Sequence, residues 1–343
     1  MKLLTIVVPA YNAAQYLDKS VGGLRLHDER LEVIIVNDGS KDQTAELAQR
    51  YVEVAPGIVR LINQENKGHG GACTAGLRAA QGYYVRILDS DDWLDPQALA
   101  QLLDYMQDLP SQASPPDLII TNYVYEALQQ DGSFRPSPIR YNRVLDEGRK
   151  LSWEDFGRFM PWQQLLMHAL CYRREVLETI QFSMPEHCFY VDNLFAYVPL
   201  PSCRHIVYRN LDLYHYFVGR EGQSVTEESL RRNVGQQLRV NLLMNEAFSL
   251  SAMKREHPAL HRYMYHYFEM LTMTTSVILL RYRSEENLQR FHELWTAIEA
   301  HDPATYRQMR KSVLGFFILR GGRLGQAIAV HIYKRVRKIL GYT

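Results

Sequence analysis

The most constraining feature of this sequence is a regular alternation of apolar, β-branched runs with amphipathic segments over residues 1–121. The apolar runs predict strands at Leu4–Val8, Glu32–Val36, Ile58–Ile62, Tyr83–Leu88 and Leu118–Thr121. The segments near 14–25, 41–53, 70–80 and 96–107 have the apolar spacing of helices. Because near-continuous apolar strands imply a sheet covered on both faces, we predict an α/β fold with a mixed, mostly parallel, Rossmann-like sheet flanked by helices. Active residues should then follow the carboxyl ends of strands.

The rest of the chain divides into a less regular middle and a helical end. Gln129–Pro138 contains D-G-S followed by two prolines, which predicts a hairpin or a surface loop. From about Thr226 onward apolar residues recur at helical spacing. We therefore expect two domains, at residues 1–225 and 226–343. Their charges differ, since residues 1–215 hold 20 Lys or Arg and 27 Asp or Glu, whereas residues 216–343 hold 19 and 11.

The composition points to an ordinary globular protein of the cytoplasm. With 46% hydrophobic and 22% charged residues, disordered and fibrous classes are excluded. The four cysteines are widely spaced and form no C-x-x-C pair, which favours a reducing compartment. The apolar run Leu3–Val8 is too short for a signal-peptide core, and no uncharged stretch reaches the ~18 residues of a membrane-spanning helix. Secretion and membrane spanning are not expected.

Two motifs after predicted strands suggest a nucleotide site. Asp38 closes the second strand within N-D-G-S, where a carboxylate can accept hydrogen bonds from a ribose hydroxyl or a base N–H. A plain Asx turn or helix cap explains it equally well. After the third strand, N-K-G-H-G-G-A at residues 66–72 enters a helix whose N-terminus favours anions. A tight turn is again the alternative, and we interpret His69 as a surface or packing histidine.

The sharpest signal is the run Asp89-Ser90-Asp91-Asp92 at the end of the fourth strand. Three carboxylates within four residues repel one another unless a positive charge neutralises them. Mg²⁺ prefers carboxylate oxygens together with substrate phosphates, so this D-x-D pattern predicts a site for a metal–diphosphate unit. The alternative is a solvated acidic turn before the helix that starts near Pro96.

The order of these motifs, together with Ile6-Val7-Val8-Pro9-Ala10-Tyr11-Asn12, resembles the nucleotide-sugar-binding half of a family 2 glycosyltransferase of the GT-A fold. The resemblance is close over residues 3–107 and looser to about residue 225. It implies a nucleoside pocket, a nearby lysine turn, and carboxylates that hold ribose and a Mg²⁺- or Mn²⁺-diphosphate. The residues that match these roles are Pro9, Tyr11 and Asp38 for the nucleoside, Lys67 and Gly68 for base, ribose or phosphates, and Asp89 and Asp91 for ribose and metal.

The resemblance also implies a catalytic base and a donor-covering segment. Inverting members use a carboxylate in an E-D-x-x-F-like segment, and Tyr190–Phe195 fits with Val191 in place of the glutamate, which makes Asp192 the candidate base. A helix-capping aspartate is the alternative. Residues 219–224 resemble a G-R-x-G-Q-S segment, so Arg220, Gln223 and Ser224 are expected to close over the donor. At Ala72-Cys73-Thr74, where many members have A-R-N, an arginine contact is not carried over.

These observations predict a metal-dependent inverting glycosyltransferase. The resemblance implies a nucleoside-diphosphate sugar donor, most often a UDP-sugar, and a hydroxyl on a glycan or lipid-linked acceptor of cell-surface polysaccharide assembly. Two alternatives stay open: a nucleotidyltransferase, and a catalytically silent scaffold that binds nucleotide sugars. The region after the first strand has no Gly-rich triphosphate signature, which weighs against the nucleotidyltransferase.

The C-terminal segment predicts a basic amphipathic helix. Residues 303–343 contain nine Lys or Arg and no Asp or Glu. Helical spacing places one group of apolar residues on a single face, namely Ile328, Ile332, Val336, Ile339 and Leu340. One interpretation is peripheral attachment to anionic lipid on the inner face of the plasma membrane. The other is a terminal helix packed on its own domain or on a second subunit of a homo-oligomer. No nucleic-acid-binding motif accompanies the charge, so a nucleic-acid partner is not expected.

Overall fold

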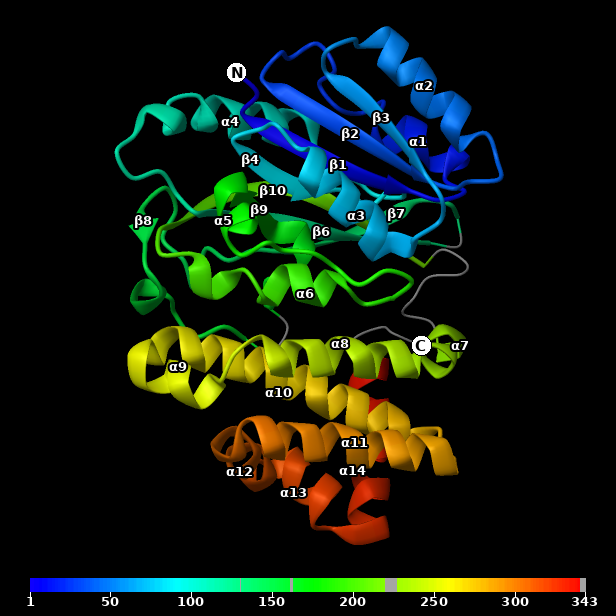
Figure 1. The fold of residues 1–343 in the computed structure, drawn as a ribbon, viewed down its shortest axis with the longest axis vertical. Coiled ribbons are helices and arrows are strands. Elements are labelled where there is room, and N and C mark those ends of the chain that lie inside the picture. Colours follow the sequence, from blue (N-terminus) through cyan, green and yellow to red (C-terminus); the bar gives the residue numbers. More distant parts are fainter. Residues whose placement is uncertain (130, 161–162, 220–226, 340–343) are drawn as a thin grey trace. The chain divides into compact units, whose positions relative to one another are not determined.

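The computed structural model describes residues 1–129, 131–160, 163–219 and 227–339. The chain divides into two compact units, residues 1–220 and residues 221–343, which are described separately below. All five strands predicted in the first 121 residues are present, and so are the four helices between them. The first unit is built around a ten-stranded sheet, and the second consists of helices over its described residues (Figure 1).

The first half of the sheet is parallel. Its strands lie in the order β3-β2-β1-β4, so the chain adds two strands on one side of β1 and then crosses to the other. Every residue of β1 and β2 is buried, which explains why their sequences are mostly apolar instead of alternating. The strands are β1 (Leu4–Ala10), β2 (Leu31–Asp38), β3 (Val59–Gln64) and β4 (Tyr84–Ile87).

The second half of the sheet mixes strand directions. One strand runs antiparallel between the two halves, and six of the ten strands share one direction. The predicted hairpin at Gln129–Pro138 is confirmed, because β6 and β7 pair antiparallel there. The strands are β9 (Leu170–Arg173), β6 (Leu118–Leu128), β10 (Ile206–Val218), β5 (Trp93–Leu94), β7 (Phe134–Ile139) and β8 (Lys150–Leu151).

Helices cover the sheet, and two of them contain residues of the predicted site. The helix after β3 packs on β1 and β2, and the helix after β5 packs on β10. The α-helices of this unit are α1 (Ala14–Ser20), α2 (Thr44–Val54), α3 (Gly68–Ala79), α4 (Pro96–Met106), α5 (Arg174–Thr179) and α6 (Asp192–Tyr197). Short 3₁₀ helices lie at Leu109–Ser111, Trp153–Asp155, Met167–Ala169 (η3) and Leu200–Ser202.

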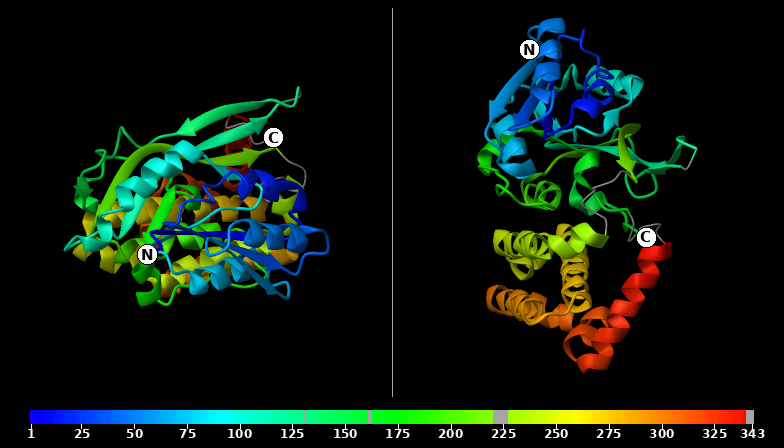
Figure 2. Two further views of the ribbon diagram at one scale, coloured as in Figure 1. Left: turned by 90° about the horizontal axis from the view of Figure 1, so that it is seen from above. Right: turned by 90° about the vertical axis from the view of Figure 1, so that its right-hand side faces the viewer.

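The second unit confirms the predicted helical C-terminal region. Side-chain oxygens of Ser249, Ser284, Asp302 and Ser312 each accept a backbone N–H at the start of a helix, which explains where several helices begin. Figures 1 and 2 show these helices around the long α10. The helices are α7 (Glu227–Arg232), α8 (Val234–Ala247), α9 (Leu250–Glu256), α10 (Pro258–Arg281), α11 (Glu285–His301), α12 (Pro303–Lys311), α13 (Val313–Leu319) and α14 (Gly322–Ile339). No helix in the described ranges combines the length and the apolar character needed to cross a membrane.

Candidate active site

The predicted nucleoside residues follow parallel strands that end at one edge of the sheet. The strand order reverses between β1 and β4, and ligands of open α/β sheets bind outside the carboxyl ends of strands at such a point. Pro9 is buried in β1, while Tyr11, in the loop that follows, is 52% exposed. The loop is tied to the end of β2, because the backbone N–H of Asn12 donates to the Ser40 hydroxyl.

Asp38 is buried at the end of β2 and is only half satisfied. Its Oδ1 accepts hydrogen bonds from the Gln64 side chain at 2.7 Å and from the Lys67 backbone N–H at 2.8 Å. Its Oδ2 is buried and has no hydrogen-bond partner among the described residues. A buried acceptor without a donor is costly, so this oxygen suits a ligand that brings an N–H or O–H group.

The turn with Lys67 and Gly68 is held against the segment before α6. The Lys67 ammonium pairs with Glu186 at 3.0 Å, and its backbone carbonyl accepts the N–H of His187 at 2.7 Å. Gly68 has φ +73°, and a Cβ there would lie 3.0 Å from the His187 backbone. This turn therefore needs glycine both for its conformation and for the close approach of residue 187.

Two further glycines of this region serve packing. A Cβ on Gly70 would lie 2.3 Å from the carbonyl oxygen of Pro185, and a Cβ on Gly76 would lie 2.2 Å from Cγ1 of Val7. The glycines thus let α3 approach β1 on one side and the 185–188 segment on the other. The tight-turn interpretation of this motif accounts for Gly68, whereas close packing accounts for Gly70 and Gly76.

Replacing Gly76 with alanine is expected to destabilise the protein by about 1–3 kcal/mol, because overpacking against Val7 outweighs the gain of up to about 1 kcal/mol in helix propensity. Urea unfolding measures the change. The matched control is Gly235→Ala in α8, where the new Cβ would meet only the flexible Arg290 guanidinium at 3.3 Å. Adding Val7→Ala should relieve the clash, so the double variant loses less than the sum of the single losses. Equal stability of Gly76→Ala and the parent would contradict this packing.

The loop after β4 holds the three aspartates of the D-x-D run in different surroundings. Asp92 is fully buried, and its carboxylate accepts hydrogen bonds from the Tyr214 hydroxyl at 2.6 Å and the Phe217 backbone N–H at 2.8 Å. Burial and the neighbouring carboxylates of Asp91 and Asp89 raise the pKa of Asp92 well above its ordinary value. Tyr214 also accepts the backbone N–H of Asp89, so β10 fixes the conformation of this acidic loop.

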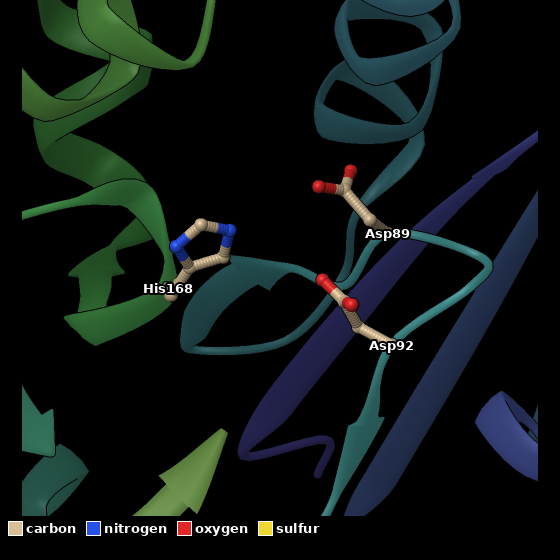
Figure 3. Close-up of side chains that lie close together, drawn as sticks. All are labelled: Asp89, Asp92 and His168. Atoms are coloured by element: carbon tan, nitrogen blue, oxygen red, sulfur yellow. The ribbon is translucent and has the colours of Figure 1, made fainter. Parts of the chain in front are cut away.

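Asp89, Asp92 and His168 form a possible metal centre. Ligand atoms of all three lie within 4.8 Å of one another. Figure 3 shows the His168 ring beside the two carboxylates. His168, from η3, is 5% exposed, and its Nδ1 has no hydrogen-bond partner in the described structure. Burial lowers the pKa of His168 to about 4, so the ring is neutral, the form that binds metals. Two carboxylates with a free imidazole nitrogen fit a divalent cation, and the oxygen-rich set suits Mg²⁺ or Mn²⁺.

His69, interpreted from the sequence as a surface or packing histidine, also makes a specific polar contact in the site. Its Nε2 lies 2.8 Å from a carboxylate oxygen of Asp89, and the ring lies against the Cys73 thiol one helical turn further along α3. Burial opposes protonation, but Cys73 and Asp89 nevertheless raise the pKa of His69 well above its usual value. The chain thus places a histidine with a raised pKa on Asp89, one turn before the position at which A-R-N members carry arginine.

Asp192 lies in the electrostatic field of the same cluster. It is half-buried at the first position of α6, after Tyr190, whose φ of +65° is rare for a bulky residue. Burial raises the pKa of Asp192, His69 opposes this rise, and Asp89 adds to it. The buried Val191 beside it contributes to the apolar surroundings. Two predicted site carboxylates 103 residues apart in sequence therefore interact electrostatically.

His215 faces away from this cluster. Neighbouring side chains of a strand point to opposite faces, so His215 is on the other side of β10 from Tyr214. Its Nδ1 lies 2.8 Å from Glu126, and its ring stacks on Trp93. The ammonium of Lys19 lies 3.2 Å from the centre of the Trp93 ring. Trp93 is therefore a packing residue next to the acidic loop.

Some predicted site residues were not brought into this cluster. Asp91 is half-buried and is not one of the three grouped ligands, so its metal role stays a prediction. Arg220, Gln223 and Ser224 lie outside the described residues, and their role also stays a prediction. His168 was missed, because a single histidine in the apolar stretch 165–171 has no motif around it.

Known proteins share the motifs and the fold. Residues 5–156 match the family model described as Glycosyl transferase family 2. The putative glycosyltransferase EpsH of Bacillus subtilis is 30% identical over 222 residues, which is 62% of this chain and 60% of EpsH. Chondroitin synthase of Escherichia coli is 41% identical over 103 residues, which is 30% of this chain and 15% of that protein. The chain thus spans 60% or less of the length of these two relatives.

The fold comparison extends over nearly all of the chain. Residues 1–349 of S. aureus TarS, solved in complex with UDP-GlcNAc, superpose with a TM-score of 0.69, covering 98% of this chain and 92% of that one. The sequence identity is 17%, so this match shows the fold. The family motifs and the fold agree with the resemblance drawn from the sequence. Residues 5–156 of this chain therefore form a glycosyl transferase family 2 domain, and the chain has the GT-A fold.

Proposed function

We propose that the protein is a metal-dependent inverting glycosyltransferase that uses a nucleoside-diphosphate sugar, with a UDP-sugar as the first candidate. The observation that carries the proposal is the group of Asp89, Asp92 and His168 at the carboxyl edge of the sheet, together with Asp192, whose pKa responds to the charge of Asp89. It combines a set of metal ligands with a carboxylate of raised pKa. The relative of the same fold that was solved with UDP-GlcNAc makes UDP-sugars the donors to test first.

In this proposal the nucleoside is bound between the ends of β1 and β2. The unpaired Oδ2 of Asp38 accepts a hydrogen bond from a base N–H or a ribose hydroxyl. Tyr11 offers an exposed ring beside this position, and Lys67 offers an exposed cation for base, ribose or phosphates. Asp89 and Asp91 face the ribose and the diphosphate, with Arg220, Gln223 and Ser224 covering the donor.

The transfer step needs one base and one stabilised leaving group. The Asp192 carboxylate accepts the proton of an acceptor hydroxyl, whose oxygen attacks the anomeric carbon while the bond from that carbon to the diphosphate oxygen breaks. Attack on the face opposite the leaving group inverts the configuration. A bound Mg²⁺ or Mn²⁺, held by Asp89 with Asp91 or with Asp92 and His168, would neutralise charge on the departing diphosphate. The acceptor is proposed to be a glycan or lipid-linked hydroxyl.

Removing the metal is expected to abolish donor binding. We expect a UDP-sugar to raise the melting temperature in the presence of Mg²⁺ or Mn²⁺, because a ligand that binds only the folded state stabilises it. EDTA should cancel this rise, and added metal should restore it. Asp91→Asn tests the predicted ligand directly. A donor-induced rise in melting temperature that persists in EDTA and is unchanged in Asp91→Asn would contradict the metal assignment.

Analysis of the reaction products distinguishes this proposal from the two alternative functions. A nucleotidyltransferase would release pyrophosphate from a nucleoside triphosphate, whereas the proposed enzyme releases UDP from a UDP-sugar. A silent scaffold would bind the donor and release neither. Turnover with any acceptor, or hydrolysis of the donor by water, therefore distinguishes the three. A panel of nucleotide sugars, screened by thermal stabilisation, then identifies the donor.

A further inference from the structure

The last two helices leave an unusual amount of apolar surface uncovered. Twelve large apolar side chains are exposed among the described residues, and five of them belong to α13 and α14. These two helices together span residues 313–339, so the exposed apolar side chains are concentrated there. The five, with their exposed fractions, are Val313 (73%), Phe316 (48%), Leu324 (75%), Ile328 (38%) and Ile332 (36%).

The packing of α14 explains why this surface is not used within its own unit. The two helices meet closely, since a Cβ on Gly325 would lie 2.5 Å from the carbonyl oxygen of Phe317. Ala329, one turn further along α14, is fully buried. Leu324, Ile328 and Ile332 follow each other at intervals of four residues and form one stripe beside that buried face. We call these three residues the α14 stripe. The right-hand view of Figure 2 shows α14 as a long helix joined to α13 by a sharp turn.

The charge around the α14 stripe has a single sign. Residues 303–343 hold nine Lys or Arg and no Asp or Glu. Arg320, Arg323, Lys334 and Arg335 are exposed. At 100° per residue, Arg335 lies in line with the stripe, whereas Arg323 and Lys334 point about 120–140° away from its centre, on the side away from Ala329. A second copy of the chain docked here would bring two basic surfaces together without an acidic partner from this segment. An anionic lipid surface would complement both the apolar stripe and the positive charge of this segment.

We propose that α13 and α14 dock on an anionic lipid surface, with the α14 stripe in the interfacial region and the basic side chains of this segment, Arg335 foremost, at the lipid phosphates. An amphipathic helix binds a membrane in this way through buried apolar area together with attraction to anionic lipid. The inference rests on the exposure and charge of this surface and does not depend on the proposed function. A lipid-linked acceptor, if that part of the proposal holds, would be met at the same surface.

Co-sedimentation of the full chain with vesicles tests the docking. We expect binding to vesicles that contain about a third phosphatidylglycerol, weak binding to pure phosphatidylcholine, and release as the salt concentration rises. Each basic residue near an anionic surface contributes about fivefold in affinity. Lys334→Glu with Arg335→Glu should therefore lower the partition coefficient by at least about 25-fold. Ile328→Asp with Ile332→Asp should lower it at least tenfold, including at low salt.

Matched controls carry the same changes on another exposed helix. Val54→Asp with Arg50→Glu alters α2, where Val54 is 75% exposed and Arg50 is exposed. This control should bind vesicles like the parent chain. Circular dichroism spectra and melting curves check that all variants fold. Absence of binding to anionic vesicles, or binding that the stripe variant leaves unchanged, would overturn the proposal. If the chain does not bind vesicles but self-associates through the α14 stripe, that result would overturn the proposal in favour of a homo-oligomer.

Discussion

Asp192→Asn is expected to lower turnover by at least about 10²-fold while donor affinity changes little. General-base catalysis contributes about 10²–10⁴-fold, and an amide cannot accept the acceptor proton at neutral pH. Asparagine has nearly the same shape, so the helix start at α6 and the contact between Asn193 and residue 192 should survive. Steady-state kinetics give turnover, and calorimetric titration with the donor gives affinity.

The pH profile gives this prediction a second measurement. Because a base must be deprotonated, and burial with Asp89 raises the pKa of Asp192 while His69 opposes it, kcat should fall on the acid side at a pH above the ordinary aspartate value. Asp192→Asn should lose this acid limb. The control is Asp146→Asn, a change at an aspartate that is 72% exposed and pairs only at the surface with Arg149. Full turnover in Asp192→Asn would show that another residue acts as the base.

Asp89→Asn is expected to weaken donor binding by about 10²-fold and to remove most turnover. Asp89 belongs to the metal-ligand group and also contacts the His69 ring at 2.8 Å, so the variant loses a carboxylate that both a metal ion and His69 would use. A hydrogen bond to a charged group contributes about 1.5–3 kcal/mol, which corresponds to about 10–10²-fold in affinity, and loss of the metal adds to it. Titration with donor at several Mg²⁺ concentrations measures both effects.

His69→Gln separates the two roles of Asp89. It removes the cation but leaves the carboxylate, so donor binding should still depend on the metal and should weaken less than in Asp89→Asn. If Asp89 acted only by orienting His69, the two variants would have equal donor affinity. That result would contradict the assignment of Asp89 to the ribose and the metal.

The sequence predicts those parts of the fold that depend on local residue patterns. Continuous apolar runs such as Leu4–Val8 define buried parallel strands, and the residues after them are placed at one sheet edge by the topology alone. This is why Asp38 and Asp89 could be identified before the structure. Asp192 was found through the family resemblance, because a short helix start has no distinctive pattern of its own.

The contacts that escaped prediction depend on packing between distant segments. His69 reaches Asp89 because glycines at 70 and 76 let α3 approach its neighbours closely. His168 reaches Asp92 because β9 and β10 carry their flanking residues to the same edge as β4. Neither distance follows from the periodicity of the sequence. In the C-terminal unit the amphipathic pattern predicted the helix, but the face that packs was set by Gly325 and Ala329.

The stereochemistry of donor hydrolysis tests the central claim most directly. Water replaces the acceptor in this reaction, so no acceptor needs to be known. With an α-linked donor such as UDP-GlcNAc and Mg²⁺ or Mn²⁺, proton NMR at early times follows the anomeric signal of the released sugar before it mutarotates. The account predicts that the β-anomer appears first and that Asp192→Asn slows its release. Release of the α-anomer first, at a rate that Asp192→Asn leaves unchanged, would contradict inverting transfer with Asp192 as the base.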